Sequence, residues 1–174
     1  TNAAVNDPSA HQDEHSIEVQ VPFIQHLFAD AKILPILTQP NKQSISLGEA
    51  VGGIVKQQKK TIICIGSTDL THYGPRYGFT PMGTDAKALR WASDVNDKEF
   101  IDFALQLEPQ KMLASAAENF NACGPGAAAA TVAAAKKLGK TKGLLLAHTD
   151  SGKVMLEKMG VASADAVGYA AIVF

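Results

Sequence analysis

The sequence lacks the features that mark several large classes of protein. It has two cysteines and one tryptophan in 174 residues, too few thiols for the disulfide framework of a small secreted domain. Its apolar runs are well below the roughly 18 residues that a membrane-spanning helix needs, and no basic region followed by an apolar one opens it. We therefore expect a soluble, cytoplasmic protein with no membrane partner.

An excess of one charge is also missing. Lys and Arg number 16 against 17 Asp and Glu, which leaves a formal net charge of -1. The basic clusters are no longer than the pairs at 59–60 and 136–137, so a phosphate backbone would find little to bind, and we expect no nucleic-acid partner. The glycines fit neither a dinucleotide fingerprint nor a P-loop, and no nucleophile elbow occurs, so neither a nucleotide cofactor nor a serine hydrolase is indicated.

The pattern of apolar residues predicts an α/β fold. Helical spacing predicts helices over 13–29, 44–57, 81–118 with breaks near Asn96 and Pro109, and 127–138. Apolar runs predict strands at 32–38, 61–66, 143–147 and 167–174, with 61–66 and 143–147 buried. Alternating helices and strands are typical of a layered αβα domain with a central, mostly buried sheet, and we predict one such domain over 1–174.

The most informative stretch is 66–74, GSTDLTHYG in one-letter code, where the apolar run 61–65 stops and an acid and a histidine follow. Ligands and catalytic groups in α/β proteins sit at such strand ends. Asp69 can fix the tautomer of His72, or both can face a substrate. The alternative is a turn in which Asp69 only caps local amides. The density of polar residues between two glycines favours function.

Cys123 precedes the predicted helix in the stretch 121–126, NACGPG. Unpaired amides and the dipole at a helix start stabilise an anion, so a thiolate there can bind a metal or attack an electrophile. The alternative is a small buried residue before a turn. Cys64 lies between two isoleucines and is expected to be an inert core thiol.

The other histidines give weaker signals. Glu14 and His15 lack the partner of an H-E-x-x-H zinc site and are expected to cap the first helix. His26 is expected to be structural or solvated. His148 follows a predicted strand, which is a suitable position for a pocket, but it has few polar neighbours.

Four segments together resemble the Memo family, whose bacterial and archaeal members are called AmmeMemoRadiSam system protein B. The segments are residues 13–23, 67–74, 121–124 and 167–171. They span essentially the whole chain but only the carboxyl-terminal two thirds of a usual family member. Because the chain also opens on Thr1 and enters a predicted helix within about a dozen residues, with no strand before it, we expect that an amino-terminal part is missing.

The resemblance implies a fold similar to that of class III extradiol dioxygenases, non-haem iron enzymes that cleave catecholic rings. It implies a pocket like their metal site, with Cys123 as one metal ligand and with Asp69 and His72 lining the pocket. The family's two histidine ligands have no counterpart in this chain, and we expect them from the missing amino-terminal segment. Family activities range from copper or iron binding with redox chemistry to phosphopeptide binding and a role beside radical-SAM proteins.

These observations leave three hypotheses. The first is a metal-dependent redox or oxygenase-like protein that uses iron or copper, with zinc less suited, in which Cys123 is the ligand, His72 the acid–base group and Asp69 its orienter. The second is a non-catalytic module that binds a peptide or small molecule in the same pocket. The third is a cysteine hydrolase with Cys123 as nucleophile. Expected partners are a small-molecule or peptide ligand, the missing segment, and a radical-SAM protein.

Overall fold

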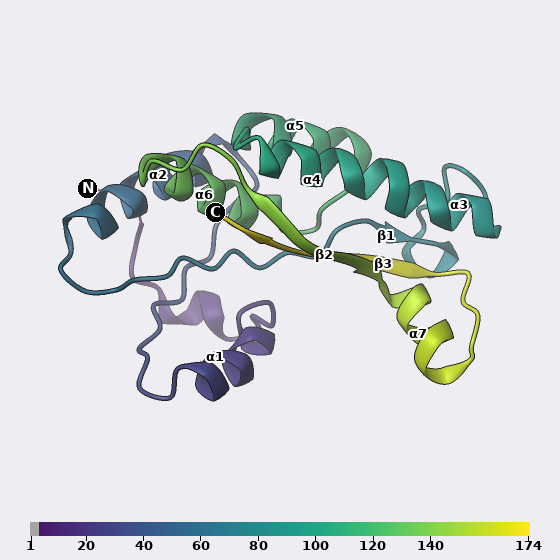
Figure 1. Ribbon diagram of the computed structural model, residues 1–174, viewed down its shortest axis with the longest axis horizontal. Helices are drawn as coiled ribbons and strands as arrows, with labels where there is room; N and C mark the ends of the chain where they lie inside the picture. Colours follow the sequence, from purple (N-terminus) through teal and green to yellow (C-terminus); the bar gives the residue numbers. More distant parts are fainter. Residues whose placement is uncertain (1–3) are drawn as a thin grey trace.

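The computed structural model describes residues 4–174 as a mixed α/β fold (Figure 1). Its α-helices are α1 (Val21–Leu27), α2 (Lys42–Gln57), α3 (Ala86–Trp91), α4 (Lys98–Leu105), α5 (Pro109–Asn119), α6 (Pro125–Lys137) and α7 (Ser151–Met159). The strands are β1 (His72–Tyr73), β2 (Leu144–Asp150) and β3 (Ala166–Val173), and the short turns are η1 (Pro8–His11), η2 (Glu18–Gln20), η3 (Pro75–Tyr77) and the π-helical η4 (Ala92–Asp97). In the described part of the chain, every helix is too short or too polar to cross a membrane.

Helices α2 and α6 pack against each other in parallel, and glycines allow their close approach. A Cβ atom on Gly48 would lie 2.0 Å from the carbonyl oxygen of Ala130, and one on Gly52 would lie 2.8 Å from that of Ala134. A step of four residues along one helix therefore matches a step of four along the other, in the same direction. The alanine-rich sequence of α6 fits this close pairing, because small side chains let the two backbones approach.

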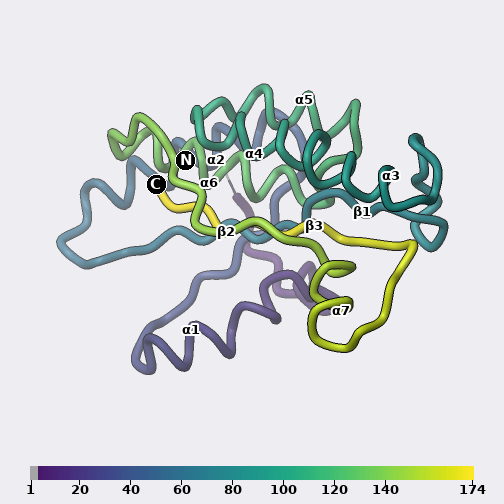
Figure 2. The backbone as a smooth tube through the Cα atoms, turned by 45° about the vertical axis from the view of Figure 1, so that its right-hand side comes forward, coloured from purple at the N-terminus to yellow at the C-terminus, as the bar shows by residue number. Residues whose placement is uncertain are grey.

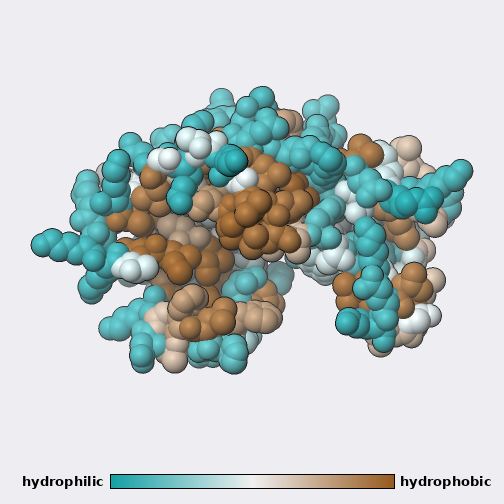
Figure 3. All heavy atoms as spheres, in the orientation of Figure 1, coloured by the Kyte–Doolittle hydropathy of each residue, from teal (hydrophilic) through white to brown (hydrophobic). Residues whose placement is uncertain are grey.

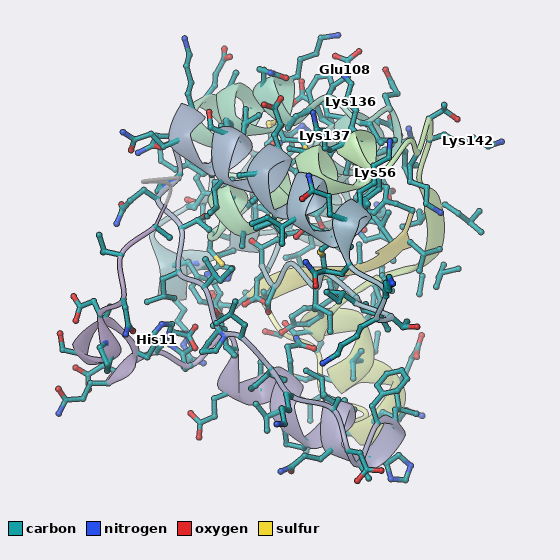
Figure 4. All side chains as sticks on the ribbon, turned by 90° about the vertical axis from the view of Figure 1, so that its left-hand side faces the viewer. His11, Lys56, Glu108, Lys136, Lys137 and Lys142 are labelled. Carbon is teal, nitrogen blue, oxygen red and sulfur yellow. The ribbon has the colours of Figure 1, made fainter. Side chains whose placement is uncertain are left out.

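The parallel arrangement brings the carboxyl-terminal ends of α2 and α6 together. Lys56 lies in the last turn of α2, and Lys136 and Lys137 lie in the last turn of α6. Figure 4 shows the three side chains at the same end of the molecule. Positive charge at a helix carboxyl terminus interacts favourably with the helix dipole, so these lysines stabilise both helix ends.

The main hydrophobic core lies within the helical layer. Its fully buried members come mostly from α4, α5 and α6 and include Phe100, Leu107, Met112 and Val132. Burying a side chain of this size stabilises the fold by about 1.5–3 kcal/mol. Ile172 and Phe174 pack against this core from the carboxyl end of the chain, so β3 is attached to the helical layer.

Helices α3 and α4 are joined by the π-helical turn η4 without a break in the helical backbone. The side chain of Asp85 caps the start of α3 by accepting the backbone N–H groups of Lys87 and Ala88. Near the end of η4, two consecutive polar residues, Asn96 and Asp97, are both buried. In a regular α-helix, the side chains of successive residues point about 100° apart. π-helical turns depart from that geometry and are often found at functional sites.

The sheet is antiparallel, with the strand order β1-β3-β2. Leu144 pairs with Val173, and the register shifts between Leu145 and Ala147. Figure 1 shows α2, α4, α5 and α6 above this sheet and α1 and α7 below it. The predicted layered α/β class is confirmed. Helices 44–57, 81–118 and 127–138 and the last two strands are present, with the predicted break at Pro109. The break predicted near Asn96 was wrong, because η4 continues the helix from α3 into α4.

Several local predictions were wrong. Residues 32–38 and 61–66 are extended but pair with no strand, and 61–65 and 144–147 are mostly exposed instead of buried. Figure 2 shows 61–66 as a bare segment leading toward β1. An isoleucine-rich run is expected to be buried only if another layer covers it, and no other described part of the chain does so. The predicted helix 13–29 is reduced to η2 and α1, and α7 was not predicted.

Candidate functional site

Three side chains with metal-binding or catalytic chemistry converge where two loops meet. Asp69, His72 and Cys123 each offer one donor atom, and these atoms all lie within 4.8 Å of one another. Asp69 precedes β1, His72 opens it, and Cys123 lies two residues before α6. Cys123, which is 51 positions after His72 and 54 after Asp69, therefore joins them in one cluster.

The backbone of the two loops is joined by direct hydrogen bonds. The N–H of Cys123 donates to the carbonyl oxygen of Asp69 at 3.2 Å, and the N–H of Gly124 donates to Oγ1 of Thr68 at 2.8 Å. The Thr68 hydroxyl donates in turn to the Asp69 carbonyl oxygen at 2.9 Å and lies 3.9 Å from the Cys123 sulfur. Thr68 thus uses its one short side chain to hold the first loop against the start of α6.

Strand β3 fixes the other side of the Asp69–His72 segment. The N–H of Leu70 donates to the carbonyl oxygen of Gly168 at 2.9 Å, and the N–H of Gly168 donates to that of Thr71 at 3.0 Å. Along this extended backbone successive side chains alternate in direction. Thr71 and Tyr73 are buried, and His72 between them is partly exposed, so the pairing with β3 turns the imidazole toward the cluster and solvent.

The structure requires the two glycines at the ends of the segment 66–74. A Cβ atom on Gly66 would lie 2.4 Å from Oγ1 of Thr131 on α6. Gly74 has φ 122°, a conformation open almost only to glycine, and a Cβ there would lie 2.3 Å from a carboxylate oxygen of Asp165. That same oxygen accepts the N–H of Arg76 at 2.9 Å. The segment is therefore fixed at both ends by close contacts.

The buried carboxylate of Asp97 supports the Asp69–His72 segment through its backbone. Asp97 accepts the N–H of Thr71 at 2.9 Å, and its other oxygen lies 3.2 Å from Nε2 of His148. Burial raises the pKa of Asp97 above its usual value, and the hydrogen bonds from Thr71 and His148 act in the opposite direction. Burial is the larger effect, because only 2% of this side chain is exposed.

Asparagine side chains extend this buried polar network to the second loop. Asn96 donates to the Thr71 hydroxyl at 3.1 Å and to the carbonyl oxygen of Asn119 at 3.0 Å. Asn121 donates to the carbonyl oxygen of Asn96 at 3.1 Å and to the Ser115 hydroxyl at 2.8 Å. Both loops of the cluster thus rest on η4, and a shift of η4 would move both.

The cluster itself is open to solvent. Nε2 of His72 lies 3.3 Å from a carboxylate oxygen of Asp69, with 36% and 47% of the two side chains exposed, and Cys123 is exposed. An ion pair this exposed contributes little to stability. The Asp69–His72 contact is therefore better explained as orienting the imidazole than as stabilising the fold.

Two tyrosines lie beside the cluster. The ring of Tyr77 lies 5.0 Å from that of His72, centre to centre. Burial raises the pKa of Tyr169, and the negative charge of Asp69 raises it further. Phenol rings at the edge of an open site offer flat apolar surface and a hydrogen-bonding group to a ligand.

The structure brings together the three residues that the sequence singled out, and it places the other candidates elsewhere. His148 contacts Asp97 and lies outside the cluster. Glu14 caps the first turn by accepting the N–H groups of Ser16 and Ile17, and His15 and His26 are exposed. Cys64 is only partly buried, and this burial raises its pKa.

Sequence reasoning missed the residues that support the cluster. Asp97, Asn96 and Asn121 are polar residues in predicted helical or loop segments, where the pattern gives no sign of burial. One signal was available for Asn121, which belongs to the same NACG stretch as Cys123. The role of Asp97 depends on the π-helical turn, and periodicity with a period of 3.6 does not predict such a turn.

Comparison with known proteins places these segments in a wider context. A family model described as Memo-like protein matches residues 1–173. A MEMO1 family protein of Thermococcus kodakarensis is 35% identical over 97% of this chain and 58% of its own length. Relatives of the same name from Pyrococcus furiosus and Methanosarcina acetivorans are 37% and 36% identical over 96% of this chain, and 58% and 57% of their own lengths. The chain thus spans little more than half the length of the curated relatives it matches.

Proposed function

This chain belongs to the Memo-like family, and from that premise we propose that the Asp69–His72–Cys123 cluster is the protein side of a transition-metal site with redox or oxygenase-like chemistry. One observation supports the proposal above all others. A thiolate, an imidazole and a carboxylate from two loops place their donor atoms within 4.8 Å of one another. A single ion can reach donors spaced in this way.

The donor set fits a metal of a particular kind. Thiolate and imidazole suit iron, copper and zinc, whereas an all-oxygen set would suit magnesium or calcium. Cys123 is exposed and is the one ligand assigned in this cluster, so coordination positions stay open for further protein ligands and a substrate. A bound iron or copper ion would supply redox chemistry at those positions, which zinc cannot do, so we propose iron or copper.

The residues take different roles in this proposal. Cys123 binds the ion through Sγ, since it is the strongest soft ligand of the three. His72 carries a proton to or from the substrate, and Asp69, 3.3 Å from its Nε2, holds the ring in one orientation. The Thr68 hydroxyl, 3.9 Å from the sulfur, holds the loop in place and limits the directions from which a ligand reaches Cys123.

Metal content of the purified chain tests the proposal. We expect about one iron or copper ion per chain after reconstitution under anaerobic conditions, measured by elemental analysis, and loss of most of it in Cys123→Ala. Cys64→Ala is the matched control, because Cys64 lies outside the cluster, and it should bind as the parent chain does. Equal metal content in Cys123→Ala and the parent chain would refute the assignment.

The division of roles has its own test. His72→Ala should keep most of the metal and lose the metal-dependent consumption of O₂ with a catechol as the test substrate. If His72→Ala loses the metal as completely as Cys123→Ala does, His72 is a ligand and the acid–base assignment is wrong.

The two tyrosines favour a second candidate function, a module that binds a peptide or small molecule without catalysis. Tyr77 and Tyr169 flank the cluster, and their phenol rings supply contact area that a metal does not need. Calorimetry with short peptides, phosphorylated and unphosphorylated, separates the two functions. Binding that persists in metal-free protein and in His72→Ala supports the second one.

A further inference from the structure

Seven lysines gather at one end of the helical layer, although they come from two separate stretches of the sequence. The stretches are 50–68 and 119–149, and neither contains an aspartate or a glutamate. The other nine basic residues are spread among all 17 acidic ones, so charge is strongly segregated in a chain whose formal net charge is only -1. We call the seven lysines the basic end: Lys56, Lys59, Lys60, Lys136, Lys137, Lys140 and Lys142.

The parallel pairing of α2 and α6 creates the basic end. A Cβ atom on Gly52 of α2 would lie 2.8 Å from Cβ of Lys137 on α6, so the last turns of the two helices are in contact. The lysines outside the helices follow these ends within five residues, a length of chain that spans at most about 18 Å. Figure 4 shows Lys142 at the same end of the molecule as Lys137, and Figure 3 shows hydrophilic side chains along that left-hand end.

The basic end has no acidic partner within the described chain. All seven lysines are exposed, and within residues 4–174 none of them forms an ion pair. The acidic side chain labelled beside them in Figure 4, Glu108, pairs with Lys111 instead. Like charges closer than the Debye length, about 8–10 Å at physiological salt, repel one another. An anionic partner would relieve this repulsion.

The helix dipole explains only part of the basic end. Lys56, Lys136 and Lys137 lie in the last turns of their helices, where positive charge is favourable. The effect falls off within that last turn, and the other four lysines lie beyond the helix ends. Stabilisation of the helices therefore leaves most of the basic end unexplained.

The side chains of the basic end suit carboxylates better than a nucleic acid. The stretches 50–68 and 119–149 contain no arginine, and their one aromatic residue, Phe120, precedes α6 and so lies toward the other end of that helix. Arginine binds phosphate through two parallel hydrogen bonds, and aromatic rings stack on bases. Lysines instead act as separate point charges on flexible stems, which can adapt to the carboxylates of a polypeptide.

A shallow groove along α2 and α6 continues the basic end. Its lining includes Glu49, Gly53, Ile54, Gln57 and Lys137. The absence of a side chain at Gly53 lowers this face of α2, and 54% of Ile54 beside it is exposed. Lys137 belongs to both the groove and the basic end, so the two form one surface. A flat membrane would not fill a groove, whereas an extended peptide can lie in one.

We propose that the basic end and this groove bind an acidic, extended segment of a partner protein. Carboxylates of the segment pair with the lysines, and an apolar side chain contacts Ile54. Glu49, two turns before Lys56 on α2, repels acids from the far end of the groove, so the acidic part lies over the lysines. The length of α6, about 20 Å, separates this surface from Cys123, so this proposal and the metal site can fail independently.

A labelled synthetic peptide tests the proposal. The probe has about ten residues, glutamates around one central leucine, and its binding to the chain is followed by fluorescence anisotropy at physiological salt. We expect saturable binding that weakens by a factor of about ten or more in the double variant Lys136→Glu/Lys137→Glu, because two attractions become two repulsions. Absence of binding, or equal binding by this variant, would overturn the proposal.

Two further double variants control for net charge and for folding. Lys87→Glu/Lys158→Glu makes the same change in net charge on α3 and α7, and it should bind the peptide within a factor of about two of the parent chain. Lys136→Gln/Lys137→Gln removes charge without reversing it, and it should weaken binding by a factor of about three to five. Equal weakening by the first pair would refute a local surface.

The groove has a separate test. Ile54→Ser should weaken binding of the peptide by a factor of about three, because it removes apolar contact with the central leucine. A second peptide, in which serine replaces that leucine, should bind Ile54→Ser and the parent chain equally. The same loss with both peptides would refute the contact in the groove.

Two other anionic probes distinguish the possible partners. Oligothymidylate tests for a nucleic acid, and vesicles of phosphatidylserine and phosphatidylcholine test for a membrane surface. We expect both to bind more weakly than the peptide at physiological salt. If either binds as tightly and depends equally on Lys136 and Lys137, the basic end recognises phosphate groups, and the assignment to an acidic polypeptide is wrong.

Discussion

The paired loops of the cluster and the exposed apolar segment 61–65 are two very different regions of this molecule. In the loops, the backbone N–H groups of Leu70, Thr71, Cys123 and Gly124 all have acceptors within the chain, and the acceptor for Thr71 is the buried carboxylate of Asp97. In 61–65, the side chains of Ile62, Ile63 and Ile65 are exposed, and the backbone forms no hydrogen bond with another described segment. The comparison teaches that the loops of the candidate site are held by hydrogen bonds within this chain, whereas the segment 61–65 makes none to another described segment.

The largest effect is expected from removing the buried carboxylate that supports the site. Asp97→Ala leaves the N–H of Thr71 buried and unpaired and His148 without its partner. We expect a loss of about 3–5 kcal/mol in the free energy of unfolding, measured with urea. Asp94→Ala is the matched control, because Asp94 is exposed on the same helical turn, and it should change stability by less than about 0.5 kcal/mol.

The pH dependence of stability sharpens this prediction. Because burial raises the pKa of Asp97 in the folded state, its contribution to stability is fully present below the unfolded value, near 3.8, and is lost as pH rises through the folded value. The Asp97→Asn variant has no ionisable group at this position. As pH rises, the parent chain should therefore lose stability relative to the variant. A difference that stays constant with pH would contradict the assigned direction.

A smaller effect is expected at the boundary of the site segment. Gly74→Ala forces a side chain into φ 122° and against Asp165, and we expect it to cost about 2–3 kcal/mol in urea unfolding. Gly53→Ala provides the control. Gly53 lies in helix α2, and the nearest atom to a Cβ there would be Cε of Lys137, at 3.9 Å. The substitution should therefore stabilise the chain by about 0.5–1 kcal/mol. Stabilisation by Gly74→Ala would show that the segment is not fixed there.

The reactivity of the two thiols compares the regions directly. Cys123 is exposed in the cluster, whereas partial burial raises the pKa of Cys64 and lowers its thiolate fraction. Iodoacetamide at neutral pH should label Cys123 faster than Cys64 by a factor of about ten, followed by mass spectrometry. The difference should narrow as pH rises, because more Cys64 thiolate forms. Equal rates at neutral pH would contradict the prediction and would also count against Cys123 as a nucleophile.

The smallest effect is expected in the exposed segment 61–65. Ile63→Thr should change the stability of the chain alone by less than about 0.5 kcal/mol, because 62% of this residue is exposed. Met112→Ala, in the helical core with 1% exposed, should cost about 2–5 kcal/mol. If Ile63→Thr costs as much as Met112→Ala, the segment 61–65 is covered in solution and the contrast between the two regions fails.

The sequence predicted the helical layer and the three cluster residues because these depend on local signals. Periodic apolar residues and caps mark α2, α4 and α6, and a polar run between glycines marks Asp69 and His72. The apolar runs at 32–38 and 61–66 were predicted as strands because the composition of each run favours a strand when a partner strand is present. Pairing depends on a partner strand, and no described segment of this chain supplies one.

The supports of the site could not be predicted for a different reason. Asp97 acts through contacts with residues 26 and 51 positions away, and a single sequence gives no sign of such distances. Its position also depends on η4, where the helix takes up one more residue per turn than the pattern assumes. Local patterns therefore identified the residues of the cluster but not the framework that holds them.

The turn η4 also constrains how the length of this sequence can change. Deleting one residue within 92–97 would return the rod of α3 and α4 to regular α-helical geometry and rotate α3 by about 100° relative to α4. Tyr73, which packs against Trp91 at the end of α3, would lose that neighbour. Substitutions are tolerable at many exposed positions here, but a single-residue deletion in this stretch would disconnect the helical layer from the loop that carries the candidate site.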